Sequence, residues 1–384
     1  MTDYTQTNTM PRPPASSRAR KSGNRLPPVR RGLRLAAVAA PLPLLLAVTV
    51  GASAVPAQAA STTGLSSAGR APAPGIAPAA ACASPAGTGW KQVATPNPGN
   101  FDELNGVAVL SSCQGWAVGN YSGGTLIESW DGTAWTQQPS PSPGSAGNGL
   151  FAVAATSATD AWAVGDYSTT ADPAHTQALI EHWDGTAWKQ VPTPNPTAND
   201  ALSGVAAISA TDAWAVGEYV TGAGIRTLIE HWDGTAWKQV PSPSPGGTNG
   251  STLSSVDATS ATSAWAVGNY FSSGTVDKTL IEHWNGTTWT RVPSPSPGGS
   301  NGSALSGVDA ASAASAWAVG SYSNMDKTLI LHWNGTTWTR VASPNPSPFS
   351  NELSGVAAAS PADIWAVGIH SVELNFLTLA LHCC

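Results

Sequence analysis

Bulky and small residues alternate with a period of two through the repeated part of this chain. In Ala213–Tyr219 the bulky Trp214 and Val216 alternate with Ala213, Ala215 and Gly217. A period of two is typical of β-strands, whose successive side chains point to opposite faces, and the glycine and valine disfavour a helix. The pattern predicts short strands with one bulky face and one small face.

The same alternation recurs at nearly constant intervals. The sequence Trp-Ala-Val-Gly begins at Trp116, Trp162, Trp214, Trp265, Trp317 and Trp365. The spacings of 46, 52, 51, 52 and 48 residues are typical of a repeat architecture.

Each repeat contains the signals for four strands. In the third copy the expected strands are Leu202–Ile208, Ala213–Tyr219, Thr227–Trp232 and Ala236–Val240, separated by turns. Four short antiparallel strands in about 50 residues correspond to one blade of a propeller. We therefore expect an all-β fold, a six-bladed β-propeller of four-stranded antiparallel blades.

The two ends of the repeated region match two parts of one repeat. Gly89–Val93 copies the fourth strand at Ala187–Val191, whereas Thr378–His382 copies a third strand and the chain stops after it. We expect the N-terminal strand to complete the last blade and close the ring, which removes exposed sheet edges. The structural alternative is a solenoid, which would need capping repeats.

The residues before the repeats predict export. Three arginines precede an apolar stretch from Leu35 to Val55, and a small-residue cleavage pattern follows, so residues 1–59 are expected to be a signal peptide. A retained membrane anchor is the alternative. Residues 60–86 are rich in Ala, Pro and Ser and predict a linker, and residues 87–384 the propeller.

Removal of the signal peptide changes the charge. The segment holds 8 of the 17 basic residues and 1 of the 23 acidic residues, which leaves 9 basic against 22 acidic and a net charge of −13. Because phosphate binding needs clustered Lys and Arg, we expect no nucleic acid partner, and no membrane insertion after cleavage. The expected location is secreted or extracellular, with association to a cell wall left open.

The chain has four cysteines, Cys82, Cys113, Cys383 and Cys384. An exported chain would oxidise them, and adjacent cysteines bond each other only with strain. We therefore expect Cys383 and Cys384 to pair separately with Cys82 and Cys113. No spacing among them predicts a zinc site.

The hairpin at Ser129–Trp135 supports a distant resemblance. Its Trp-Asp-Gly-Thr-Ala-Trp sequence is similar to the Asp-box turn of sialidases, with one residue of difference in the Asp-to-Trp spacing. The chain resembles secreted bacterial β-propellers with kelch-like or Asp-box-like repeats over residues 87–384, although the kelch Gly-Gly doublet is absent. The resemblance implies the propeller fold, and it does not imply that the chain belongs to either family.

Third strands carry a histidine at one register: His182, His231, His283, His332 and His382. Third strands lie far from a propeller axis, so these side chains cannot converge on one metal ion. We expect them to be structural, with no metal or cofactor. Glu128, Glu181, Glu230 and Glu282 precede this register, and Leu331 and Leu381 replace them in the last two copies, which suggests a partly exposed position.

One aromatic register follows the second strand and predicts a ligand-binding rim. It consists of Tyr121, Tyr167, Tyr219, Tyr270, Tyr322 and His370. The loops after it vary in length and content, and variable loops on a rigid scaffold commonly bind ligands. Tyrosines there could stack on sugar rings or contact a protein, and the competing interpretation is that each fills a blade edge.

Two first strands carry a carboxylate where the other four have alanine, at Asp257 and Asp309. Paired carboxylates can hydrolyse a glycosidic bond. The main hypothesis is a secreted, non-enzymatic module that binds a carbohydrate or protein ligand on the face with the loops between second and third strands. The alternatives are a polysaccharide hydrolase or lyase that uses these aspartates, and a structural cell-surface protein.

Overall fold

The computed structural model describes residues 92–169, 175–272, 274, 276–360, 362–372 and 375–383, together with the backbone of the two-residue strand β1 (Ala47–Val48). All of them belong to one compact unit, Leu42–Cys384. The predicted signal peptide and linker lie outside the described residues, apart from β1. Those two boundaries therefore stay predictions.

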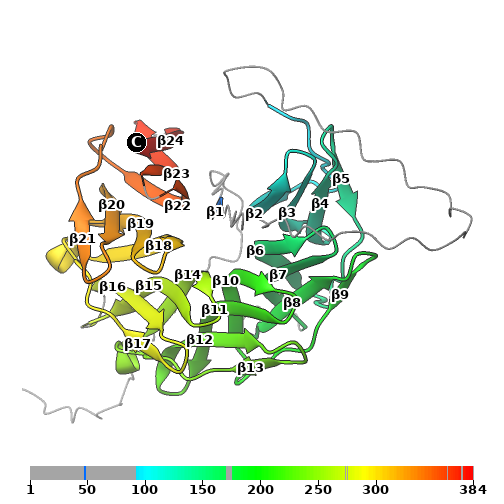
Figure 1. The fold of residues 1–384 in the computed structure, drawn as a ribbon, viewed down its shortest axis with the longest axis horizontal. Coiled ribbons are helices and arrows are strands. Elements are labelled where there is room, and N and C mark those ends of the chain that lie inside the picture. The colour runs from blue at the N-terminus through cyan, green and yellow to red at the C-terminus, as the bar shows by residue number, and fades with distance from the viewer. Residues whose placement is uncertain are drawn as a thin grey trace, which may run out of the picture. The chain divides into compact units, whose positions relative to one another are not determined.

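Six sheets follow one another along the chain, and each contains one blade of antiparallel strands (Figure 1). Blade 1 is β2 (Asp102–Ser111), β3 (Gln114–Tyr121), β4 (Gly124–Trp130) and β5 (Trp135–Gln138). Blade 2 is β6 (Gly147–Ser157), β7 (Asp160–Ser168), β8 (Gln177–Trp183) and β9 (Trp188–Gln190). Blade 3 is β10 (Asp200–Ser209), β11 (Asp212–Thr221), β12 (Gly224–Trp232) and β13 (Trp237–Gln239).

The later blades repeat this order. Blade 4 is β14 (Ser251–Ser260), β15 (Ser263–Phe271), β16 (Asp277–Trp284) and β17 (Trp289–Arg291). Blade 5 is β18 (Ser303–Ser312), β19 (Ser315–Tyr322), β20 (Lys327–Trp333) and β21 (Trp338–Val341). Blade 6 is β22 (Asn351–Ser360), β23 (Asp363–Val372) and β24 (Asn375–Cys383). The short 3₁₀ helices η1 (Gly247–Asn249) and η2 (Gly299–Asn301) precede blades 4 and 5.

The first strands of successive blades pack side by side around a common axis, and the fourth strands lie outermost (Figure 1). This is the predicted six-bladed β-propeller with four-stranded antiparallel blades. The fold class is confirmed.

Blade 6 has three strands in the described part of the chain. The strand expected to complete it, Gly89–Val93, falls at the edge of that part: residues 89–91 lie outside it, and Gln92 and Val93 form no strand. The use of this segment as the fourth strand stays a prediction.

Strand β1 pairs in parallel with β2 through Ala47 opposite Gly106 and Val48 opposite Val107. The two residues belong to the segment predicted to be cleaved. Among the described residues, no helix has the length and apolar character needed to cross a membrane.

A glycine in the second strand allows the first strand to approach closely. At Gly217 an added Cβ would lie 2.0 Å from the carbonyl oxygen of Ala201, which leaves no room for a side chain. The ladder between β10 and β11 shifts by one residue at the same place, between Leu202 and Gly204. Such a bulge redirects one side chain, and here the redirected residue is Ser203. The glycine of Trp-Ala-Val-Gly therefore makes space for a β-bulge.

A tryptophan wedge joins one blade to the next. The ring of Trp214 in β11 lies 4.9 Å from that of Trp284 and 5.1 Å, edge-on, from that of Trp289, both in blade 4. The wedge also packs on the small face of blade 4, which includes Ala264 and Ala266. Trp116, Trp162 and Trp265 make the same two contacts with the blades that follow them.

The last wedge differs from the others in exposure. Trp365 in β23 is 41% exposed, whereas Trp214 is 1% exposed. Its only ring contact among the described residues is with His382, at 4.2 Å. Trp365 therefore gains less from burial than Trp214 does.

The wedge predicts unequal costs for the same truncation. Trp214→Ala is expected to lower the free energy of unfolding by about 3–5 kcal/mol, because it leaves a cavity between two blades. Trp365→Ala should cost clearly less, because much of its ring is already in water. Urea unfolding followed by circular dichroism measures both. Equal losses would contradict the exposure of Trp365 and would show that this ring is covered in solution.

Candidate functional site

The predicted aromatic register lies at one end of the blades, where second strands end and third strands begin. Tyr219 pairs with Asp200 at the start of the first strand and with Arg226 at the start of the third. All six members, Tyr121, Tyr167, Tyr219, Tyr270, Tyr322 and His370, are half-buried. Tyr167, Tyr219, Tyr270 and Tyr322 also pack against the clusters between blades. Each of these four tyrosines thus supports a blade edge and still presents part of its ring to solvent.

The polar partners of these tyrosines differ from blade to blade. In blade 2 the Tyr167 hydroxyl donates a hydrogen bond of 2.6 Å to Gln177 Oε1. In blade 4 Arg291 donates to the Tyr270 hydroxyl at 2.8 Å and lies over the ring at 4.6 Å. Arg340 does the same with Tyr322 in blade 5. The same scaffold position therefore has a neutral surface in blade 2 and a cationic one in blades 4 and 5.

Proline-rich connections between blades run beside this register and are held in place by hydroxyl groups. The Thr227 hydroxyl of β12 lies 2.8 Å from Ser242 Oγ and 2.8 Å from Ser244 Oγ, and Ser244 also accepts the Thr227 N–H. Blades 1, 4 and 5 make the corresponding threonine-to-serine bond at Thr125, Thr279 and Thr328. The connections are thus part of the scaffold.

A groove opens beside Tyr167 in blade 2. Its volume is about 330 Å³. It is lined by Tyr167, Ala178, Gln190, Val191, Pro192, Thr193 and Asn195. Small-molecule sites in proteins span about 300–1,000 Å³, so the groove lies at the lower end of that range.

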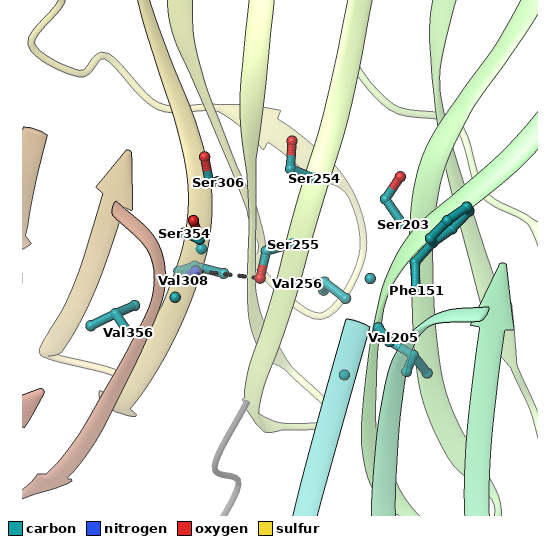
Figure 2. A pocket seen from close by; sticks show the side chains of 15 residues that line it. Phe151, Ser203, Val205, Ser254, Ser255, Val256, Ser306, Val308, Ser354 and Val356 are labelled. Carbon is teal, nitrogen blue, oxygen red and sulfur yellow. Dashed lines mark hydrogen bonds between the residues drawn. The ribbon is translucent and has the colours of Figure 1, made fainter. Parts of the chain in front are cut away.

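A second, smaller cavity lies on the propeller axis (Figure 2). The bulges of the first strands bring Ser203, Ser254, Ser306 and Ser354 to its wall, and Phe151 takes the equivalent place in blade 2. The Ser354 hydroxyl is buried and has no hydrogen-bond partner among the described residues. The cavity encloses about 40 Å³, enough for only a few water molecules. That volume is too small for a sugar ring.

Asp257 and Asp309 link neighbouring first strands. The Ala310 N–H of blade 5 donates to Asp257 Oδ2 at 2.7 Å, and the Ala358 backbone of blade 6 bonds to Asp309. Burial raises the pKa of both carboxyl groups, and the charge of Asp257 raises that of Asp309 further. Neither residue lines the axial cavity. The structure thus brings the two together as inter-blade bridges.

The histidines of the third-strand register stack on tryptophans, half-buried in blades 2–5 and exposed in blade 6. The ring of His231 lies 4.2 Å from that of Trp214, and its Nε2 bonds to Asp212 Oδ1 at 2.8 Å. His182 and His382 contact an aspartate in the same way, whereas His283 and His332 contact a serine. In the described part of the chain, no three His, Cys, Asp or Glu side chains gather as metal ligands would. Each of these imidazole rings therefore packs on the tryptophan ring of the second strand of its own blade.

Turns at the opposite end of the blades are nearly identical. Asp233 Oδ1 accepts the N–H groups of Thr235 and Ala236 at 2.9 and 3.0 Å. The next residue, Gly234, has φ of +87°, which favours glycine. Asp131, Asp184, Asn285 and Asn334 accept the same pair of bonds. This end offers the same geometry in five blades.

The glutamate register is buried, and our expectation of partial exposure was wrong. Glu128, Glu181, Glu230 and Glu282 are all 0% exposed, as is Leu331 in blade 5. The exchange of glutamate for leucine marks a core position on the small face of the blade. Glu230 accepts a hydrogen bond from Thr193 of the preceding connection, whereas both carboxyl oxygens of Glu181 and Glu282 have no partner among the described residues.

Burial changes the protonation of these glutamates. It raises the pKa of Glu181, Glu230 and Glu282 to about 8 and, with the nearby charge of Asp102, that of Glu128 to about 7. An uncharged carboxyl group is the form that a dry interface tolerates. The sequence pattern located these titratable groups, but it did not reveal their burial.

Cys113 takes part in a disulfide, whereas Cys383 is a free and exposed thiol. Cys383 lies opposite Ile364 on the last strand, at the position where other blades have a tryptophan. The structure does not contain the pairing expected for Cys383. Cys82 and Cys384 lie outside the described residues, so the rest of the expected scheme stays a prediction.

Comparisons with known proteins give structural likeness only. No protein-family model matches the chain, and no curated protein matches it significantly. One similar solved structure is YCF48 bound to D1 peptide, 15% identical with a TM-score of 0.44, covering 69% of this chain and 74% of that chain. U3-55K is 12% identical with a TM-score of 0.47, and the match covers 71% of this chain and 76% of that chain. YCF48 from Cyanidioschyzon merolae is 12% identical with a TM-score of 0.38, and the match covers 73% of this chain and 96% of that chain. Likeness at this level says nothing about function.

The buried glutamates predict a stabilising substitution. Glu181→Leu, which copies Leu331 of blade 5, is expected to raise the free energy of unfolding by on the order of 1–3 kcal/mol at pH 8, because it removes an unpaired buried carboxyl group. The folded pKa of about 8 lies above the reference value of 4.5. The native state therefore holds the proton more tightly, and stability falls as the pH rises between these values.

Urea unfolding of both proteins at pH 5 and pH 8 checks this. The advantage of Glu181→Leu should be larger at pH 8, and Glu181→Gln should remove the same pH-dependent part without adding apolar contacts. An advantage that does not change with pH would mean that Glu181 has an ordinary pKa in the folded protein.

Proposed function

We propose that this protein is a secreted, non-enzymatic binding module, and that it binds a carbohydrate or protein ligand on the end of the propeller that carries Tyr121, Tyr167, Tyr219, Tyr270, Tyr322 and His370. A propeller fold is consistent with a binding module. The proposed secretion depends on the signal-peptide pattern of residues 1–59.

The contrast between the two ends of the blades is the observation that carries this proposal. One end repeats the same turn in five blades, with the same two backbone hydrogen bonds and a glycine at positive φ. The other end keeps an aromatic ring at each tyrosine register and changes its partner from Gln177 to Arg291 or Arg340. Loops and side-chain partners that vary on a rigid scaffold are typical of a recognition surface.

Half-burial suits the tyrosines to recognition. A ring held by a core cluster on one side loses little conformational freedom when a ligand packs on the other side, which favours affinity. Tyrosine also combines an apolar ring with a polar hydroxyl, which suits both sugar rings and protein surfaces. The interpretation that these residues only fill blade edges predicts no effect of their truncation on any ligand.

A ligand search with the full chain tests the proposal. A glycan array and an affinity capture from the native secretome are both used to find the ligand, and Tyr167→Ala or Tyr219→Ala is expected to weaken its binding by about threefold to tenfold, because each removes one aromatic contact. Lys238→Ala, at the opposite end, serves as the matched control and should leave binding unchanged. If no ligand found by either route responds to the tyrosine variants, the recognition surface is not at this end.

The alternative of a polysaccharide hydrolase or lyase depends on Asp257 and Asp309. The structure favours a scaffold role for them, because their carboxylates bond to backbone groups of the next blade. We expect Asp257→Asn and Asp309→Asn to leave ligand binding unchanged. Each variant should also be more stable than the native chain by a larger margin at pH 8 than at pH 5, because asparagine carries no buried charge.

Thermal unfolding at the two pH values and binding of the identified ligand check this expectation. A turnover of polysaccharide by the native chain that both variants abolish would support the enzyme instead. A structural cell-surface role remains the interpretation if neither a ligand nor a turnover is found.

A further inference from the structure

We propose that the groove beside Tyr167 in blade 2 binds a neutral carbohydrate, with a sugar ring stacked on Tyr167, and that Ala178 is the residue that opens the groove. This inference rests on the proposed function, because it locates one ligand site on the tyrosine-bearing end and names the class of ligand.

Ala178 is the exception in a register that is otherwise threonine. The first inward position of the third strand is Thr125, Thr227, Thr279, Thr328 and Thr378 in the other blades. In blades 1, 3, 4 and 5 this threonine hydroxyl lies 2.6–2.8 Å from a serine of the proline-rich connection. Alanine removes both the hydroxyl and the methyl group from that place, and Ala178 lines the groove.

The connection of blade 2 is held by other contacts. The Ala178 N–H donates to Asn195 Oδ1 at 2.7 Å, so the backbone stays anchored without the threonine. Thr193, which replaces the serine, donates its hydroxyl hydrogen bond to Glu230 of blade 3. The side chain that would otherwise close the space is thus bonded to the neighbouring blade. The groove follows from the local sequence and needs no distortion of the scaffold.

The ring of Tyr167 is already oriented in the groove. Its hydroxyl is fixed by Gln177, and the ring packs against the cluster between blades 1 and 2. The exposed Gln190 of β9 lines the same groove. In blades 4 and 5 the position of Gln190 is occupied by Arg291 and Arg340, which lie over their tyrosine rings. Among the described residues, blade 2 therefore combines a tyrosine ring that no guanidinium covers with the Gln190 amide, which has no hydrogen-bond partner.

The lining favours one class of ligand. None of the seven described residues that line the groove carries a charge, so none of them pairs with an ionic group. A pyranose ring offers an apolar face to an aromatic side chain and hydroxyl groups to an amide. A volume of about 330 Å³ can take one or two such rings. A neutral carbohydrate matches each of these features.

Titration calorimetry of the full chain with cellohexaose, xylohexaose and mannohexaose tests the inference. We expect at least one of the three to bind. Ala178→Thr, which restores the residue of the other blades, should weaken that binding about tenfold or more, because its side chain fills the space beside the stacked ring. Thermal unfolding should show that this variant is folded.

Two further variants make the test specific. Gln190→Arg, which copies blades 4 and 5, should weaken binding to a similar extent because the guanidinium covers Tyr167. Thr227→Ala removes the corresponding hydroxyl from blade 3 and leaves blade 2 unchanged, so it should retain full affinity at the blade 2 site.

The outcomes separate this inference from the proposed function. If none of the three oligosaccharides binds, or if binding is unaffected by both Ala178→Thr and Gln190→Arg in folded protein, the inference is wrong. The proposed function would still stand if Tyr219→Ala weakened a ligand found by array or capture. If that ligand is a protein and no oligosaccharide binds, the ligand class named here is overturned.

Discussion

The insertion of one tryptophan from each of blades 1–5 into the next blade is the interaction on which the rest of the structure depends. Trp214 needs a partner surface of small residues, and the second strand of the next blade supplies it with Ala264 and Ala266. The same strand must therefore be bulky on one face and small on the other. This requirement explains why Trp-Ala-Val-Gly recurs with so little variation. Because neighbouring blades share this contact, a change at one wedge is felt by two blades.

The small face of each blade leaves space that two different side chains fill. Space remains beside the alanines at the third-strand register, and it is filled by a glutamate in blades 1–4 and by Leu331 in blade 5. The glutamates are tolerated because burial raises their pKa and keeps them uncharged near neutral pH. Leucine fills the same space without an unpaired carboxyl group. The buried glutamates thus fill the space between blades, but they lower the stability of the fold as the pH rises.

Much of this architecture could be predicted from the sequence, because repetition reports on packing. The period of two and the spacing near 50 residues indicated blades of four strands separated by turns. The burial of Glu181 could not be predicted, because a charged residue that alternates with leucine suggests exposure when the surrounding interface is unknown. The bulge at Ser203 was also hidden, since it depends on the approach of Ala201 to Gly217.

The site was harder to predict for a related reason. A register shared by all blades describes the scaffold, so the tyrosines marked an end of the propeller and not a particular site. One blade is distinguished by a residue that differs from the residue shared by the other blades. Such a difference is informative only when the side chains around it in the structure are known. Ala178 is unremarkable as a residue, but beside the uncovered ring of Tyr167 and the redirected Thr193 it leaves a space. In a repeat protein, recognition is therefore to be sought where the packing rule is broken at one copy and the scaffold still holds.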